Sequence, residues 1–83
     1  MEVRIHPHTQ ERMGERGASE DEITEAIMEG EKFPAKFGRT GFRRNYVFDR
    51  EWKGRRYLIK QLEVFAVEEK GGWLAVTVIV KYF

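Results

Sequence analysis

Hydrophobic and polar residues follow helical spacing in the first third of the chain and strand-like alternation in the rest. Residues 2–5 alternate and predict a short first strand. Residues 8–16 have helical propensity, with Pro7 suited to the first turn and Gly17 suited to the helix end. Met13 is the only large apolar side chain in this segment, so the predicted helix has little to bury.

A second helix is predicted by stronger signals. Ser19 and Glu22 form a capping box, and the acidic residues of the first turn favour the positive end of the helix dipole. Gly30 is expected to end this helix. Its apolar stripe consists of Ile23, Ala26 and Ile27.

The remaining residues predict strands. Residues 42–49 alternate, and residues 50–56 are typical of a turn. Residues 57–67 favour β structure and become apolar on both faces, which predicts a bend or bulge. Residues 68–72 predict a hairpin loop. Residues 73–83 form the strongest strand, and its partly apolar second face predicts a central place in the sheet.

This order of elements predicts an α+β fold, with two N-terminal helices packed on one face of a mainly antiparallel, three- to four-stranded sheet. We expect a single domain spanning residues 1–83. The chain has no cysteine, which excludes disulfides and thiolate metal sites. It shows neither a signal peptide nor an apolar run long enough to cross a bilayer, so we expect a cytoplasmic protein without membrane contact.

Charge is polarised along the chain. Residues 32–62 hold ten Lys or Arg and two acidic residues, whereas residues 1–31 hold nine acidic residues and three Arg. Two interpretations are open. The basic segment is interleaved with aromatic residues, which is typical of a surface for a phosphate-rich partner. Alternatively, the acidic helix beside it neutralises the basic surface.

His8, Arg12 and Arg16 recur every four residues and therefore share one face of the predicted first helix. The guanidinium groups suit phosphate binding, and histidine suits proton transfer because its charge changes near neutral pH. The alternative is a solvated helix face with a structural histidine. His6 and His8 lack a third ligand, so no metal site is predicted.

A loop with two glycines lies at the centre of the basic segment. Gly38 and Gly41 permit backbone amides to approach a phosphate. Phe37, Phe42 and Tyr46 offer stacking faces for unpaired bases, which favours single-stranded RNA over a duplex. The alternative places these rings in the core and the charges in water. The basic candidates for nucleic-acid binding in this loop and strand are Lys36, Arg39, Arg43 and Arg44.

Lys60, Lys81 and Tyr82 fall in predicted strands. A lysine in an apolar strand needs a partner or an exit to solvent. Lys60 and Lys81 would complete a positive cleft if both emerged near the first helix. Tyr82 shares its face with Val80, which fits the core equally well, and Lys81 lies on the opposite face.

Four segments carry a family resemblance: HPHTQERMGERGASEDEI, FPAKFGRTGFRRNY, YLIKQLEVFAVEE and WLAVTVIVKYF. On these segments the chain resembles the domain-of-unknown-function family 4258 over essentially its whole length. That family is similar to the small RelE/ParE-like toxins and to BrnT, and many members of this wider group are ribonucleases silenced by an antitoxin. The resemblance implies a RelE/ParE-like fold and RNA cleavage without a metal, in which basic residues stabilise the transition state as the RNA 2′-hydroxyl attacks phosphorus. It also implies a role for Tyr82, which is similar in position to a tyrosine of that group.

Two functional hypotheses follow. The first is a toxin-type ribonuclease that needs no cofactor, binds RNA and an antitoxin-like protein, and uses His8, Tyr82 and Lys60 in catalysis. Its nucleic-acid-binding residues would be Arg12, Arg16, Lys36, Arg39, Arg43, Arg44 and Lys81. The second is a non-catalytic module that binds nucleic acid or protein through the same surface. A homodimer formed through an exposed sheet edge is a further alternative.

Overall fold

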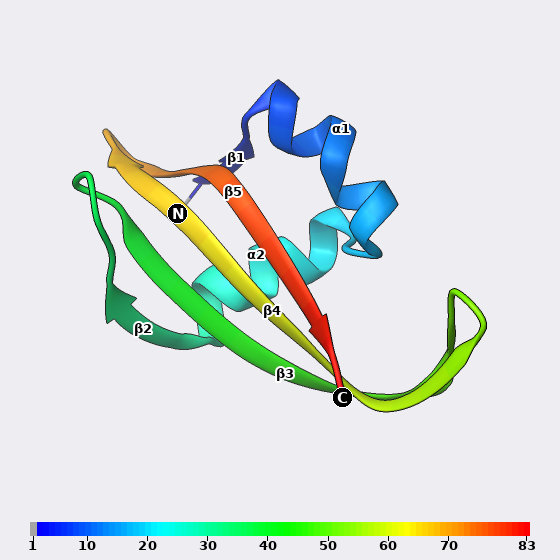
Figure 1. Cartoon of the computed structure of the whole chain (residues 1–83). Coiled ribbons are helices and arrows are strands. Elements are labelled where there is room, and N and C mark those ends of the chain that lie inside the picture. The colour runs from blue at the N-terminus through cyan, green and yellow to red at the C-terminus, as the bar shows by residue number, and fades with distance from the viewer. Residues whose placement is uncertain (1) are drawn as a thin grey trace.

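A computed structural model describes residues 2–83 (Figure 1). The elements are β1 (Glu2–Ile5), α1 (Pro7–Arg16), α2 (Glu20–Glu29), β2 (Glu31–Pro34), β3 (Thr40–Trp52), β4 (Arg55–Glu69) and β5 (Gly72–Tyr82). The fold is α+β, which confirms the predicted class. The sheet has five strands rather than three or four, because the short strands β1 and β2 flank the three long ones.

The strands are arranged in the order β1-β5-β4-β3-β2. β1 runs parallel to β5, and all other neighbours pair antiparallel. β4 is therefore the middle strand, and the central position predicted for residues 73–83 is confirmed only over the first residues of β5, which lie between β1 and β4. The pairing with β1 ends at Ala75, and beyond it the outer edge of β5 pairs with no described strand and lies beside α1 (Figure 1).

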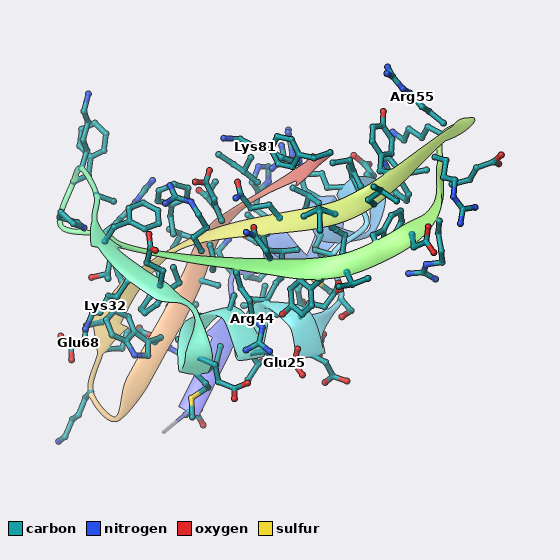
Figure 2. The ribbon with its side chains drawn as sticks, turned by 90° about the horizontal axis from the view of Figure 1, so that it is seen from below. Glu25, Lys32, Arg44, Arg55, Glu68 and Lys81 are labelled. Atoms are coloured by element: carbon teal, nitrogen blue, oxygen red, sulfur yellow. The ribbon has the colours of Figure 1, made fainter. Side chains whose placement is uncertain are left out.

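The two helices contact the sheet differently. α2 lies across one face, where its apolar stripe joins Leu62 and Val64 of β4 in the core. α1 contacts mainly β5, and Thr9 is the buried residue of this helix. α2 therefore covers the centre of this face, and α1 lies along β5 with Met13 packed against the same core. Within residues 2–83 no helix covers the opposite face of the sheet, which we call the open face (Figure 2). Neither described helix has the length and apolar composition needed to cross a bilayer.

Local signals explain the junction between the helices. Ser19 Oγ accepts a hydrogen bond from the Glu22 amide at 3.1 Å, and Glu22 Oε1 accepts one from the Ser19 amide at 3.0 Å, which confirms the capping box. Gly17 ends α1 with a φ of 86°. A Cβ at this position would overlap the Tyr82 hydroxyl and press on the Trp52 ring, so both backbone conformation and space require glycine.

A bulge in β5 changes which side chains face the core. β4 and β5 shift register between Phe65 and Ala66, and Val76 is the extra residue of β5. The shift brings Ala75 into the core together with Val78, although simple alternation would put them on opposite faces. The irregularity predicted for residues 57–67 is found at this place, with its extra residue on the partner strand.

Candidate nucleic-acid interface

The basic segment is divided between the two faces of the sheet. Arg43 and Arg44 are successive residues of β3 and therefore point to opposite sides. Arg44 lies on the helix side and pairs with Glu29 of α2 at 2.9 Å. Arg43 lies on the open face. Figure 2 shows Arg44 and Lys81 on opposite sides of the sheet, so the predicted nucleic-acid-binding cations do not form one surface.

Lys60 lies buried beneath the start of α2. Its Nζ lies 2.7 Å from Glu22 Oε2 and donates hydrogen bonds to Glu22 Oε1 at 2.9 Å and to the Gly17 carbonyl at 2.8 Å. The side chain is only 6% exposed. These bonds join β4 to the turn between the helices and to the capping box. The ammonium group that would act in the catalytic hypothesis is therefore already bonded inside the protein.

Tyr82 is also engaged inside the molecule. Its hydroxyl donates a hydrogen bond to the Arg16 carbonyl at 3.0 Å, and its ring stacks on Trp52 with centroids 5.1 Å apart. Burial, and then the charge of Glu22, raises the pKa of Tyr82 above its ordinary value. A raised pKa disfavours loss of the proton at neutral pH, so this tyrosine is poorly suited to act as a general base.

His8, Arg12 and Arg16 do come together, in a hollow between α1 and the outer edge of β5. This hollow, which we call the edge pocket, has a volume of about 110 Å³. Arg16 Nη1 donates a hydrogen bond to the Val78 carbonyl and so satisfies a backbone group at the strand edge. Arg12 is exposed and forms no ion pair within residues 2–83. The edge pocket is lined by His8, Thr9, Arg12, Arg16, Val76, Thr77 and Val78.

A larger hollow, which we call the open-face pocket, lies on the uncovered side of the sheet. Its volume of about 380 Å³ falls within the range of small-ligand sites, roughly 300–1,000 Å³. The lining is aromatic and apolar except for two cationic side chains and one hydroxyl. The open-face pocket is lined by Phe33, Pro34, Ala35, Lys36, Phe37, Arg39, Phe65 and Thr77.

Close packing of β2 on β3 forms the floor of the open-face pocket. The Phe33 ring occupies the space that a Cβ at Gly41 would need, and Gly41 is its partner in the strand register. The ring meets Phe65 edge-on, with centroids 5.9 Å apart. The Arg43 guanidinium lies 4.6 Å from the centroid of the same ring. Side chains of β2, β3 and β4 therefore fix the floor.

Glu63 neutralises charge beside this pocket. It is buried, its Oε2 accepts a hydrogen bond from Arg43 at 2.6 Å, and its Oε1 lies 3.4 Å from Lys81 Nζ. Burial acts to raise the pKa of Glu63, but the hydrogen bonds and charges of Arg43 and Lys81 outweigh it and hold the pKa below its ordinary value. Two of the predicted nucleic-acid-binding cations are thus already paired.

The rim of the open-face pocket, in contrast, keeps its positive charge. Lys36 and Arg39 form no ion pair among the described residues, and no acidic residue lines the pocket. Phe37 is 85% exposed, and the Arg39 guanidinium lies 6.0 Å from its ring. The other two predicted stacking rings are not available: Phe42 is buried in the core, and the Tyr46 hydroxyl bonds to the backbone of α2.

Sequence reasoning missed Phe33, Phe65, Thr9 and Thr77 as pocket residues. Two signals pointed to Phe33: it precedes a proline, which favours extended backbone, and glycine inside a strand marks a close approach. The other three positions depend on which elements pack together. No local signal identifies them.

No match among known proteins indicates a role for these residues, so the site is interpreted from its geometry. A scan against models of protein families found no match, and searches of curated proteins and of solved structures found none either. In the part of the chain that the structure describes, no three His, Asp or Glu side chains gather closely enough to hold a metal ion.

Proposed function

We propose that this protein binds single-stranded RNA through the open-face pocket. One observation carries the proposal: Phe33, Phe37 and Phe65 line the same pocket as Lys36 and Arg39, two cations without an ion-pair partner among the described residues. Every nucleobase can stack on an aromatic face, and the cations attract the phosphates beside the base. The ligand is therefore an unpaired nucleotide within a strand.

The distribution of ion pairs supports this choice of surface. Four cations of the basic segment are already held by carboxylates, namely Arg43, Arg44, Arg56 and Lys60. Of the six that form no ion pair among the described residues, Lys36 and Arg39 are the two that line the open-face pocket. A duplex stacks its base faces on one another and so cannot present one to a pocket of this kind. Single-stranded RNA can stack a base on the rings and place phosphates beside the cations.

The family resemblance supports RNA as the partner. The likeness to the domain-of-unknown-function family 4258 and to RelE/ParE-like toxins suggests a RelE/ParE-like version of the α+β fold. Many proteins of that wider group act on RNA. An antitoxin-like protein is the alternative occupant of the open face, and failure of RNA to bind would favour it.

A toxin-type endoribonuclease is the second candidate. It is favoured by the convergence of His8, Arg12 and Arg16 in the edge pocket, because histidine can transfer protons and guanidinium groups can stabilise a charged phosphorane. Lys60 and Tyr82, the other two catalytic candidates, are engaged in internal hydrogen bonds. The geometry therefore favours binding without turnover.

Fluorescence anisotropy with a labelled single-stranded RNA of about ten nucleotides tests the proposal. The Lys36→Gln, Arg39→Gln double variant should weaken binding and reduce the slope of log affinity against log salt by about 1.4, because each phosphate contact on a single strand contributes about 0.7. The Lys53→Gln, Arg55→Gln variant removes equal charge near the β3–β4 turn and should change the slope little. Equal losses in both variants, or equally tight binding of duplex RNA, would show that the pocket is not the site.

Incubating the same RNA with the protein in EDTA separates the two candidates. Intact RNA on a denaturing gel, with binding retained, supports the non-catalytic module. Cleavage that His8→Gln abolishes without changing the melting temperature supports the endoribonuclease. If RNA is neither bound nor cleaved, RNA is not the partner.

A further inference from the structure

A buried hydroxyl group in the edge pocket lacks a partner. Thr9 is 3% exposed, and its Oγ1 has no hydrogen-bond partner within residues 2–83. Most buried polar atoms are hydrogen-bonded, because an unsatisfied one loses its interaction with water without replacement. Less than 1 Å² of Oγ1 is accessible, so a ligand oxygen would reach it after the Thr9 side chain rotates toward the pocket, and would then recover this interaction.

Two guanidinium groups border the same pocket. The Arg16 side chain is half-buried and fixed by its hydrogen bond to the Val78 carbonyl, which leaves further N–H donors of its fork unused by that bond. Arg12 lies one helical turn earlier and has no ion-pair partner among the described residues. Glu11 and Glu15 belong to the same helix but do not line the pocket. The positive charge and the N–H donors of these two side chains therefore favour the binding of an anion.

We propose that the edge pocket is a phosphate-binding subsite in which Arg12, Arg16 and Thr9 donate hydrogen bonds to one phosphate group. Guanidinium forks match the geometry of phosphate oxygens, and charge-assisted bonds of this kind are stronger than neutral ones. A volume of about 110 Å³ corresponds to roughly three or four water molecules at about 30 Å³ each, which suits one phosphate group.

Thr77 connects this subsite to the open-face pocket, because it lines both hollows. It lies on β5 just beyond Ala75, where the pairing with β1 ends and the strand edge becomes free. A strand with a base in the open-face pocket would pass over this edge and place a phosphate in the edge pocket. This connection rests on the proposed function, whereas the phosphate subsite stands without it.

Thr9→Val tests the hydroxyl, because valine keeps the shape of threonine and removes the donor. In the free protein the melting temperature should stay the same or rise, since an unsatisfied group is removed. Affinity for single-stranded RNA should fall about 2- to 10-fold with an unchanged salt slope, because the lost donor is uncharged. A lower melting temperature would show that the hydroxyl has a structural role and would overturn its assignment as a ligand.

Arg12→Gln tests the charge, with Arg55→Gln on the β3–β4 hairpin as the matched control. Arg12→Gln should weaken RNA binding and reduce the salt slope by about 0.7, whereas the control should leave both unchanged. Equal slopes for the two variants overturn the placement of an RNA phosphate in the subsite. If the Lys36→Gln, Arg39→Gln variant then still weakens RNA binding, the proposed function stands without the subsite.

Titration with inorganic phosphate separates the two sources of the ligand. Saturable shifts of α1 amide signals in NMR spectra, lost in Arg12→Gln, support a phosphate site. If single-stranded RNA shifts the same signals and phosphate then has no further effect on them, an RNA phosphate occupies the subsite. If phosphate binds but RNA does not displace it, the subsite holds free phosphate and the connection through Thr77 is wrong. If neither ligand shifts these signals, the subsite proposal fails.

Discussion

Replacing Lys60 with methionine tests whether this lysine stabilises the fold or takes part in chemistry. The change keeps most of the apolar stem and removes the ammonium group that bonds to Glu22 and to the Gly17 carbonyl. Removing one partner of a buried ion pair costs about 3–5 kcal/mol. Glu22 is 22% exposed and keeps its bond to the Ser19 amide, so water and the capping box offset part of this cost. We expect a loss of about 2–3 kcal/mol.

Thermal unfolding followed by circular dichroism measures this loss. In a domain of this size about 1 kcal/mol corresponds to about 4–8 °C, so the melting temperature should fall by about 10–20 °C. Lys81→Met is the matched control, because Lys81 is 51% exposed and Glu63 keeps its hydrogen bonds to Arg43, so the loss should be about 0–1 kcal/mol. In the Glu22→Gln background the effect of Lys60→Met should shrink.

The outcome that refutes this reasoning is specific. If Lys60→Met melts within a few degrees of Lys81→Met but abolishes RNA cleavage or binding, Lys60 is a functional residue. The ion pair is then not the reason for its burial. An undiminished effect in the Glu22→Gln background would show instead that the loss arises from packing.

Three further predictions concern pH, chain conformation and the pocket floor. The folded-state pKa of Glu63 lies below the unfolded value of about 4.3, so its stabilising contribution is complete above about pH 5 and is lost as the pH falls through the folded-state value. Unfolding free energies of Glu63→Gln should therefore vary less between about pH 5 and pH 3 than those of the wild type; equal variation contradicts this. Gly17→Ala should lower the melting temperature more than Gly54→Ala, because both have positive φ but only Gly17 abuts other side chains; equal losses would count against it. Gly41→Ala should displace the Phe33 ring and weaken RNA binding measured by anisotropy, and an unchanged affinity in a folded variant would show that this ring is not a ligand.

Local signals were sufficient to predict the helices and the alternation of side chains along the strands. The capping box at Ser19 and the glycine at the end of α1 act within one helical turn, so the sequence alone predicts them. Residues 50–56 were predicted as one turn. In the structure β3 and β4 extend through most of this segment, and only Lys53 and Gly54 form the turn between them. Their pairing extends the strands where local composition indicates a loop.

Pairings between distant residues could not be predicted. β2 has four residues and ends at a proline, so it becomes recognisable only beside β3. The bulge at Val76 reverses the alternation from which the faces of residues 73–83 were assigned. Lys60 shows the same limit at the site: its partner Glu22 lies 38 residues earlier, and nothing in the strand itself indicates that the charge is satisfied internally.

Amide chemical shifts recorded by NMR during titration with single-stranded RNA test binding at the open-face pocket most directly. Binding at this pocket predicts the largest changes at Phe37, Arg39, Phe65 and Thr77, with little change in α2, which lies on the other face of the sheet. Largest changes in α2, or none at the four pocket residues when RNA is saturating, would contradict the proposed site.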